Sequence, residues 1–433
     1  MSRLPIILHI TKLSHEARGI ARLEGKTQFV DNALPGETVQ VKQIKKHSKY
    51  DEAIAEEIII ASAKRVIPPC PYYLKCGGCR LQHLESRAQI LFKQDLLQEQ
   101  LKHVAQCVAE EWLEPLQAKS FAYRTKVRFS VHYLSQNKKI VVGFKQMDGV
   151  RVIDLASCAV LQQKLEHLLP HFSALIAALH PKQKITEISC AMGDQDVAII
   201  MHHTHDFVAT DVTQLISFAQ KYNVDFYTYQ AHATALIKLW PAHTPHLLYY
   251  TLPRYQLTLA FHPNEFTQIN SEINALMIDK MITLLDLQAE DQVLDLFCGM
   301  GNLSLPIARF AKQVWGIEGS AKMVQQAKDN ALANQLMNTD FLTANLKNPL
   351  NLSQFSANKV VIDPPRTGAI EILPAIVSLK PERIVYISCN PATLARDAAY
   401  LIQHGYQLGK AGVMDMFPQT QHVESISLFI KKT

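Results

Sequence analysis

Segments with the pattern of strands and segments with the pattern of helices alternate from about residue 290 to the end of the chain. Such alternation predicts a parallel sheet with helices on both faces. The expected strands are 292–297, 313–318, 340–344, 359–363, 383–388, 406–415 and 425–431, and the expected helices are 303–312, 320–334, 369–378 and 391–404. Little sequence separates the last two strands, so we expect them to pair as an antiparallel hairpin. This part of the chain is therefore predicted to be a doubly wound α/β domain.

The first 61 residues have the pattern of a small β-barrel. Short apolar runs at 7–13, 27–34, 37–44 and 52–60 are separated by turn signals such as Arg18-Gly19 and Leu34-Pro35-Gly36-Glu37. The basic stretch 42–49 is expected on the surface of this barrel, either as a solvated loop or as a contact for phosphate.

The sequence pattern in the middle of the chain predicts one helix followed by a second sheet. Apolar residues recur at helical spacing over 84–104. In the expected strand 123–133, apolar side chains alternate with basic ones, namely Arg124, Lys126, Arg128 and His132. A basic wet face suits RNA phosphate, although a plainly solvated face has the same pattern. The segments 139–145 and 151–158 are expected to continue this sheet.

The composition and the lengths of the apolar runs limit which classes of protein this chain can belong to. The 433 residues include 44 basic and 39 acidic side chains, and a net charge of +5 permits an RNA partner without requiring one. No run approaches the roughly 18 apolar residues of a membrane span, and the N-terminus lacks a secretory pattern. We therefore expect a cytoplasmic protein whose eight cysteines form no disulfide framework, with clustered cysteines indicating metal binding and a lone cysteine in a motif indicating catalysis.

A cofactor site is predicted at the carboxyl edge of the α/β sheet. The first strand of this domain ends in Asp295-x-x-x-Gly299-x-Gly301, where glycines let the backbone approach a ligand. The next strands close with Glu318, Asn345 and Asp363. Open α/β sheets bind ligands at this edge. Ser304 stands where a dinucleotide motif has its third glycine, which disfavours NAD and suits S-adenosylmethionine, a cofactor without a pyrophosphate.

Cys389 is the candidate nucleophile. It follows the expected strand 383–388 and precedes Asn390-Pro391 at a helix start, a location expected to lower the pKa of the thiol. A buried core cysteine is the alternative interpretation. A thiolate that adds to carbon 6 of uracil makes carbon 5 nucleophilic toward a sulfonium methyl, and a general base must then remove the carbon-5 proton. Glu424 is the best candidate for that base, and His422 is a weaker one.

Several motifs resemble those of the RNA uracil-5 methyltransferase family, most closely its bacterial members that modify 23S rRNA. The similar stretches are FTQIN at 266–270, DLFCGMGN at 295–302, IDPPR at 362–366, SCNPATLARD at 388–397 and DMFPQTQHVE at 415–424. The resemblance implies that Cys389 is the nucleophile and Glu424 the base. It also implies that S-adenosylmethionine is bound by Gln268, Phe297, Asn302, Glu318, Asn345 and Asp363.

The resemblance also implies a domain organisation and a partner. Residues 1–62 would be an OB-like TRAM barrel that binds RNA, residues 63–83 and 116–260 a central α+β iron–sulfur domain, and residues 84–115 and 261–433 a Rossmann-like methyltransferase domain. The substrate would be 23S rRNA, free or partly assembled rather than in the mature ribosome. The enzyme would be a monomer without membrane contact.

A cysteine cluster is predicted from Cys70-x5-Cys76-x2-Cys79, with Cys158 as a distant fourth ligand. Four thiolates suit a [4Fe–4S] cluster and Zn²⁺ equally, and the resemblance favours the iron–sulfur cluster in a structural or RNA-placing role. The x5 gap and the fourth ligand argue against radical S-adenosylmethionine chemistry. The remaining cysteines are interpreted as structural, namely Cys107, Cys190 and Cys298.

Three other functions are alternatives. The same chemistry could act on tRNA or on more than one rRNA uridine. A methyltransferase of purine exocyclic amines would have an aromatic residue where Arg366 stands, and it would need no cysteine. A non-catalytic RNA-binding protein with a metal cluster would explain the barrel and the cysteines but not the cofactor edge.

Overall fold

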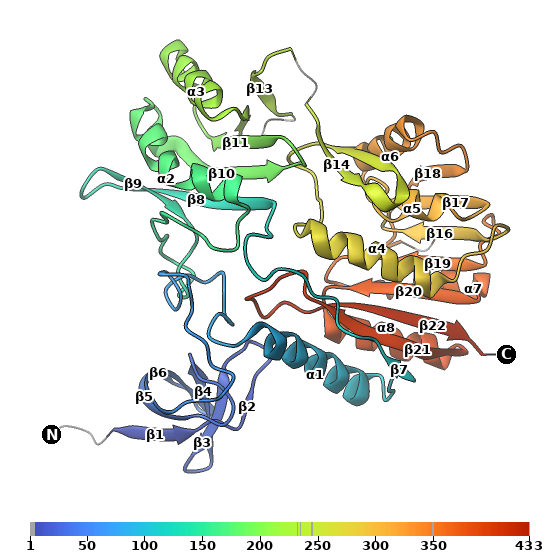
Figure 1. Ribbon diagram of the computed structural model, residues 1–433, viewed down its shortest axis with the longest axis horizontal. Coiled ribbons are helices and arrows are strands. Elements are labelled where there is room, and N and C mark those ends of the chain that lie inside the picture. The colour runs from blue at the N-terminus through green and yellow to red at the C-terminus, as the bar shows by residue number, and fades with distance from the viewer. Residues whose placement is uncertain (1–4, 232, 234, 244–245, 349, 433) are drawn as a thin grey trace.

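The computed structural model describes residues 5–231, 233, 235–243, 246–348 and 350–432. Figure 1 shows a small blue sheet at lower left, a green central sheet above it and a large sheet, yellow to red, on the right. Within the described residues, no helix is both long enough and apolar enough to cross a membrane.

The N-terminal residues form a six-stranded sheet in the order β1-β5-β6-β4-β3-β2. Its strands are β1 (Ile6–His9), β2 (Lys12–Leu13), β3 (Gly19–Leu23), β4 (Lys26–Asp31), β5 (Thr38–Lys46) and β6 (Tyr50–Ile60). Leu8, Val30 and Val39 lie in its core. Strands at 27–34, 37–44 and 52–60 are confirmed. The run 7–13 forms two short strands, β1 and β2, at opposite ends of the sheet, and β3 is an additional strand that begins at Gly19.

The central sheet has the order β13-β12-β11-β10-β8-β9. Its elements are β8 (Lys126–Leu134), β9 (Lys139–Gly143), β10 (Ile185–Met192), β11 (Val197–His203), β12 (Asp225–Gln230) and β13 (Ile237–Trp240), with helices α2 (Gln163–Ala178) and α3 (Ala209–Tyr222). The predicted alternation in β8 is confirmed, because Val127, Phe129 and Val131 are buried whereas Arg128 is exposed.

The strand expected at 151–158 is wrong. The amides of Ile153 and Leu155 donate to the carbonyls of Phe144 and Val142. The amide of Val142, however, donates to the side chain of Asp154 rather than back to the neighbouring backbone. A ladder of reciprocal bonds therefore does not develop beside β9, and the segment runs on as irregular chain to Cys158.

The C-terminal sheet has eight strands in the order β18-β17-β16-β19-β20-β22-β21-β7. These are β7 (Glu111–Trp112), β16 (Gln292–Leu296), β17 (Gln313–Glu318), β18 (Thr339–Thr343), β19 (Lys359–Ile362), β20 (Arg383–Ser388), β21 (Tyr406–Met414) and β22 (Glu424–Lys431). Strands β16 to β20 run parallel to one another, and β22 is antiparallel to both β20 and β21. The predicted parallel sheet and its final hairpin are confirmed.

Helices cover both faces of this sheet, as predicted. One core contains side chains from α4 (Ser271–Leu285), α5 (Ser304–Ala308) and α6 (Ala321–Ala333). The other contains side chains from α1 (Ser86–Val104), α7 (Leu373–Leu379) and α8 (Pro391–Gln403). Neighbouring strand residues alternate between the two cores, as Val293 and Leu294 do. Helices α5 and α7 are shorter than the expected ranges 303–312 and 369–378.

Two connecting elements lie beside the large sheet. The hairpin of β14 (Leu248–Leu252) and β15 (Leu257–Phe261) contributes Leu252, Leu257 and Leu259 to the core beneath α4. Helix α1 is distant in sequence from the sheet but packs against α8 and β21, which puts it beside the C-terminal strands (Figure 1).

Candidate active site

The glycine turn after β16 lies against the end of β17. Phe297, Gly299 and Gly301 have positive φ angles of 64°, 55° and 94°, respectively. The Glu318 carboxylate accepts hydrogen bonds from the amide of Gly299 at 3.3 Å and from the amide of Ser320 at 2.9 Å. These bonds fix the Glu318 side chain at the strand end, where a carboxylate can accept hydrogen bonds from ribose hydroxyls.

Three carboxyl groups gather at this edge, and their mutual repulsion favours a cationic ligand. Asp295 is fully buried, and burial together with the negative charges of Asp363 and Glu318 raises its pKa to about 7. Ser304 donates to one Asp295 oxygen at 2.5 Å, whereas the other oxygen is buried without a partner. Burial likewise raises the pKa of Asp363 to about 7. A sulfonium or ammonium group would relieve this accumulation of charge, so these residues fit S-adenosylmethionine.

The other expected cofactor residues lie in different settings. Asn302 exchanges amide hydrogen bonds with Asn274 at 2.8 and 3.0 Å, and accepts from the Tyr250 hydroxyl at 2.8 Å. Asn345 is exposed just beyond β18, where its side-chain oxygen accepts from the amide of Lys347. Gln268 is half-buried in the segment between β15 and α4.

Cys389 and Glu424 are brought together by the pairing of β20 with β22. Ser388 and Ser425 form the last pair of this antiparallel ladder, and Cys389 and Glu424 come next in the same register. Cys389 opens onto a cavity of about 260 Å³. Arg366, Asn390 and His422 also line that cavity.

The same cavity is completed by residues that sequence reasoning missed. His15 from the N-terminal sheet region and Leu96 and Gln100 from α1 line it together with Cys389. These residues belong to no motif and lie hundreds of positions from Cys389 in sequence, so no local signal marked them.

The expectation that the Cys389 thiol has a lowered pKa is wrong. Burial, together with the negative charges of Glu424 and Asp363, raises its pKa to about 11, and the Arg366 guanidinium offsets only part of this rise. The effect of the helix start is outweighed because desolvation and two nearby carboxylates all disfavour the thiolate. The thiol is therefore protonated at neutral pH in the free protein.

The Glu424 carboxyl has a pKa raised well above that of an exposed glutamate. Burial and the negative charge of Asp363 raise its pKa to about 8, against the opposing charges of Arg366 and Lys93. His422 differs, because burial and the charges of Arg366, Lys93 and Arg124 lower its pKa to about 4 and keep the ring neutral. Its Nδ1 lies 3.3 Å from a guanidinium nitrogen of Arg366.

The turn that carries Arg366 is fixed to the helix after Cys389. The side-chain oxygen of Asn390 caps α8 by accepting from the backbone amide of Ala392 at 3.1 Å. The side-chain amide nitrogen of Asn390 donates to the Arg366 carbonyl at 3.0 Å. Thr393 donates to the same carbonyl at 3.3 Å. These bonds hold the Asp363–Arg366 turn beside Cys389.

Cys70, Cys76, Cys79 and Cys158 line a second cavity of about 260 Å³. All four are reduced. Burial and the neighbouring sulfurs raise the pKa of Cys79 to about 11 and that of Cys158 to about 12. A bound metal centre would stabilise the thiolates and so offset the free-energy cost of ionising these buried thiols. Over the described part of the chain, however, no three Cys, His, Asp or Glu side chains are close enough to hold a single metal ion.

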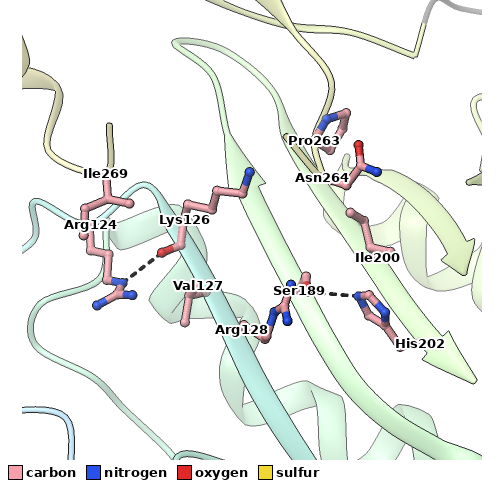
Figure 2. A pocket seen from close by; sticks show the side chains of 10 residues that line it. All are labelled: Arg124, Lys126, Val127, Arg128, Ser189, Ile200, His202, Pro263, Asn264 and Ile269. Carbon is pink, nitrogen blue, oxygen red and sulfur yellow. Dashed lines mark hydrogen bonds between the residues drawn. The ribbon is translucent and has the colours of Figure 1, made fainter. Parts of the chain in front are cut away.

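A basic pocket of about 180 Å³ lies on the wet face of the central sheet (Figure 2). Its polar lining is Arg124, Lys126, Arg128, Ser189, His202 and Asn264. Burial lowers the pKa of Lys126 to about 8, and its amine contacts the carbonyl of Glu265. Thr125 donates from its amide to the carbonyl of Ile269 at 2.9 Å, so the pocket adjoins the 266–270 segment.

Comparisons with known proteins agree with this geometry. The model of the tRNA (Uracil-5-)-methyltransferase family matches residues 86–432, and that of the TRAM domain matches residues 7–55. Two relatives named 23S rRNA (uracil(1939)-C(5))-methyltransferase RlmD, from Legionella pneumophila (strain Lens) and Alcanivorax borkumensis, are each 42% identical. The similarity to each covers 98% of this chain and 96% of the relative.

A solved structure has the same fold. The Pyrococcus abyssi tRNA (uracil-54, C5)-methyltransferase, in complex with S-adenosyl-L-homocysteine, superimposes with a TM-score of 0.75 at 21% identity. The match covers 98% of this chain and all of that one.

Proposed function

Because the chain belongs to the tRNA (uracil-5-)-methyltransferase family, we propose that it methylates carbon 5 of a uridine in 23S rRNA. The observation that carries this proposal is the position of Cys389 and Glu424, side by side at the carboxyl edge that also holds Glu318 and Asp363. The choice of 23S rRNA over tRNA is supported by the names of relatives that are 42% identical over nearly the whole chain.

S-adenosylmethionine is the proposed methyl donor, and it supplies an electrophilic methyl group on a sulfonium. Glu318 would accept hydrogen bonds from its ribose, and the negative charge near Asp295 and Asp363 would favour its cationic groups. The wider proposed binding set is Gln268, Phe297, Asn302, Glu318, Asn345 and Asp363. No pyrophosphate contact is required, in keeping with Ser304 at the third motif position.

The proposed chemistry uses Cys389 twice. The thiol loses its proton to solvent water, and the sulfur bonds to carbon 6 of the uracil while the ring becomes an enolate. Carbon 5 then takes the methyl group as the bond from that methyl to the donor sulfur breaks. The Glu424 carboxylate removes the carbon-5 proton, the carbon 5–carbon 6 double bond re-forms, and the Cys389 sulfur leaves. The target base is proposed to leave the RNA stack, since carbon 6 of a stacked base is out of reach.

A [4Fe–4S] cluster is proposed as the ligand of Cys70, Cys76, Cys79 and Cys158. Zn²⁺ and a [4Fe–4S] cluster both accept four thiolates, so the donor set alone does not separate them. The resemblance of the sequence motifs to the RNA uracil-5 methyltransferase family favours the iron–sulfur cluster, and the four cysteines line one cavity. Its proposed role is structural, or in placing RNA, because the methylation transfers no electrons.

RNA is proposed to contact the N-terminal barrel and the basic pocket of the central sheet. The TRAM match and the cationic lining at Arg124, Lys126 and Arg128 support this proposal. The protein is further proposed to act in the cytoplasm, as a monomer, on 23S rRNA that is free or only partly assembled.

Methylation of defined RNAs tests the proposal. The purified protein, S-adenosylmethionine with a labelled methyl group, and transcripts of 23S rRNA or tRNA are incubated together, and the products are mapped by mass spectrometry. We expect 5-methyluridine at one position of 23S rRNA, and loss of that mark from the rRNA of a strain lacking the gene. Methylated purine amines, or 5-methyluridine in tRNA alone, would contradict the proposal.

A further inference from the structure

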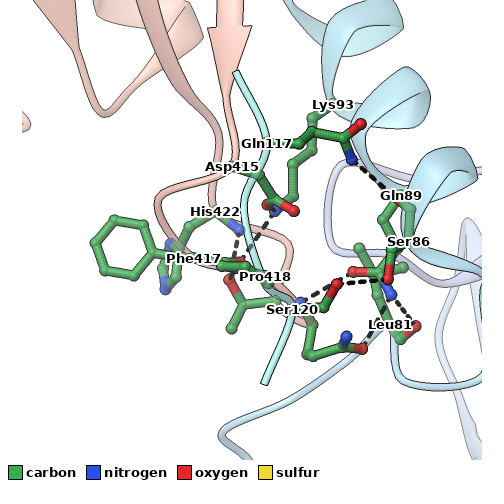
Figure 3. A network of polar contacts seen from close by, with 12 residues as sticks. Leu81, Ser86, Gln89, Lys93, Gln117, Ser120, Asp415, Phe417, Pro418 and His422 are labelled. Carbon is green, nitrogen blue, oxygen red and sulfur yellow. Dashed lines mark hydrogen bonds and ion pairs between the residues drawn. The ribbon is translucent and has the colours of Figure 1, made fainter. Parts of the chain in front are cut away.

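Helix α1 contributes a fully buried lysine to the segment that leads to Glu424. The side chain of Lys93 has an exposed fraction of 0%. Its amine lies 2.7 Å from a carboxylate oxygen of Asp415 and donates to the carbonyl of Phe417 at 3.0 Å. Figure 3 shows Lys93 reaching from the helix to these two residues.

A second buried contact joins the same helix to the same segment. The side-chain amide of Gln89 donates to the Gln419 side-chain oxygen at 2.9 Å, and the Gln419 amide donates back to the Gln89 oxygen at 2.9 Å. The Gln419 carbonyl in turn accepts from the amides of Arg80 and Leu81, just after the cysteine-rich turn. Gln419 has a φ of 70°, so the chain turns sharply at this point.

The segment held in this way is the connection between β21 and β22. Residues 415–423 leave β21 at Met414 and return at Glu424, and these two residues pair in the ladder. The ladder pairs only the backbones of these two end residues, and it does not set the direction of the Glu424 side chain or the course of the residues between them. Its middle is held by Lys93, by Gln89 and by the Tyr123 hydroxyl, which donates to the Pro418 carbonyl at 3.0 Å.

A buried ion pair of this kind adds little to stability that apolar packing could not supply. Removing two charges from water costs several kcal/mol per ion, and apolar replacements of similar volume are often neutral or stabilising. The better-attested use of such a pair is to specify one arrangement of the chain. Connections between strands are otherwise among the more mobile parts of a protein.

We infer that Lys93 is a positioning residue for the general base: its contacts with Asp415 and Phe417 hold residues 415–423 in the one course that keeps Glu424 beside Cys389. This inference rests on the proposed function. The electrostatics agree with it, since the charge of Lys93 also lowers the pKa of Glu424. The other groups that face Glu424 are Asp363, Arg366 and Cys389.

Hydrogen–deuterium exchange of the RNA-free protein tests the structural part without any assay of activity. Lys93→Met alone would leave the Asp415 carboxylate buried without its partner and would destabilise the fold strongly. The main variant is therefore the double replacement Lys93→Met with Asp415→Leu, which removes both charges and keeps apolar packing. We expect its amides at 416–422 to exchange faster than in the wild type. The control Lys102→Met changes an exposed lysine on the same helix and should leave the exchange unchanged.

Covalent adduct formation on 23S rRNA transcript tests the link to catalysis. The double variant should accumulate a methylated RNA–protein adduct that survives SDS, with a release rate lowered roughly tenfold to a hundredfold. The pH at which its release rate is half-maximal should move upward, and the separate conservative variant Lys93→Arg should restore much of the rate. Unchanged amide exchange, or wild-type release at an unshifted pH, would overturn the inference. A wild-type protein that methylates no uridine would instead overturn the proposed function and leave the exchange result standing.

Discussion

Cys389 and Glu424 occupy the register position directly beyond Ser388 and Ser425, the last pair of β20 and β22. Antiparallel pairing therefore brings Glu424 next to Cys389, although the two residues are 35 positions apart in the chain. Each carries a raised pKa, and the charge of Glu424 contributes to the raised pKa of Cys389. The thiol must thus lose its proton in a site where two carboxylates oppose the thiolate.

Replacing Cys389 with alanine should abolish methyl transfer to uridine, by at least about a thousandfold, because no other group can activate carbon 5. Single-turnover transfer of labelled methyl to 23S rRNA transcript measures the effect. Calorimetry with S-adenosylmethionine should show nearly unchanged affinity. Transfer that survives in this variant would point to methylation of an exocyclic amine, which needs no thiol.

Glu424→Gln should stall the reaction after methyl transfer, since the carbon-5 proton must leave before the Cys389 sulfur can. The amide keeps the shape of the side chain but cannot accept that proton. Denaturing gels should show RNA covalently bound to the protein, and mass spectrometry should find the methyl group in the adduct. Turnover at the wild-type rate would remove Glu424 from the mechanism.

The rate of product release should rise with pH, reach half its maximum near pH 8 and level off about one pH unit higher. Glu424, whose pKa is raised to about 8, acts as a base only when ionised, so a larger fraction is competent at higher pH. Single-turnover release is measured with saturating cofactor, because Asp295 and Asp363, with pKa values of about 7, also titrate in this range. A release rate that stays constant from about pH 6 to 9 would argue against a base of this pKa.

Glu318→Ala should weaken binding of S-adenosylmethionine by roughly tenfold to a hundredfold, the effect of losing hydrogen bonds to a charged group. Its carboxylate also orders the glycine turn by accepting from the amide of Gly299. Isothermal titration calorimetry measures the change. Glu290→Ala is the matched control, because Glu290 is exposed and precedes β16 at the opposite edge of the sheet.

The anaerobically purified protein should contain about four iron atoms and four sulfides per chain. Cys79→Ser should lower both, because this residue is a proposed ligand, and should lower the melting temperature as well. Cys107→Ser is the control, since Cys107 is half-buried and lies outside the cysteine cavity. One zinc ion per chain in place of iron would replace the proposed cluster with a single-ion site.

The sequence alone determined the α/β sheet, its cofactor edge and the family. The alternation of strands and helices after residue 290 was sufficient to predict the parallel sheet. It also predicted the ligand-binding edge, because parallel strands place their carboxyl ends at one edge of the sheet. Motif stretches such as 295–302 and 388–397 carried the resemblance, which the comparisons confirm. Cys389 and Glu424 were also predicted from the sequence as candidate catalytic residues. That prediction depended on assuming a reaction that needs a nucleophile and a base.

The protonation of Cys389 and the surroundings of Glu424 could not be predicted from the sequence, because they depend on residues from distant segments. The position of Cys389 at a helix start led us to expect a lowered thiol pKa. Burial and two carboxylates from other strands raise that pKa instead. Lys93 and His15 reach the site from segments whose local pattern says nothing about catalysis. Periodicity and motifs carry information about residues that are close together in the sequence. Desolvation and long-range contacts depend instead on which distant segments the fold brings together.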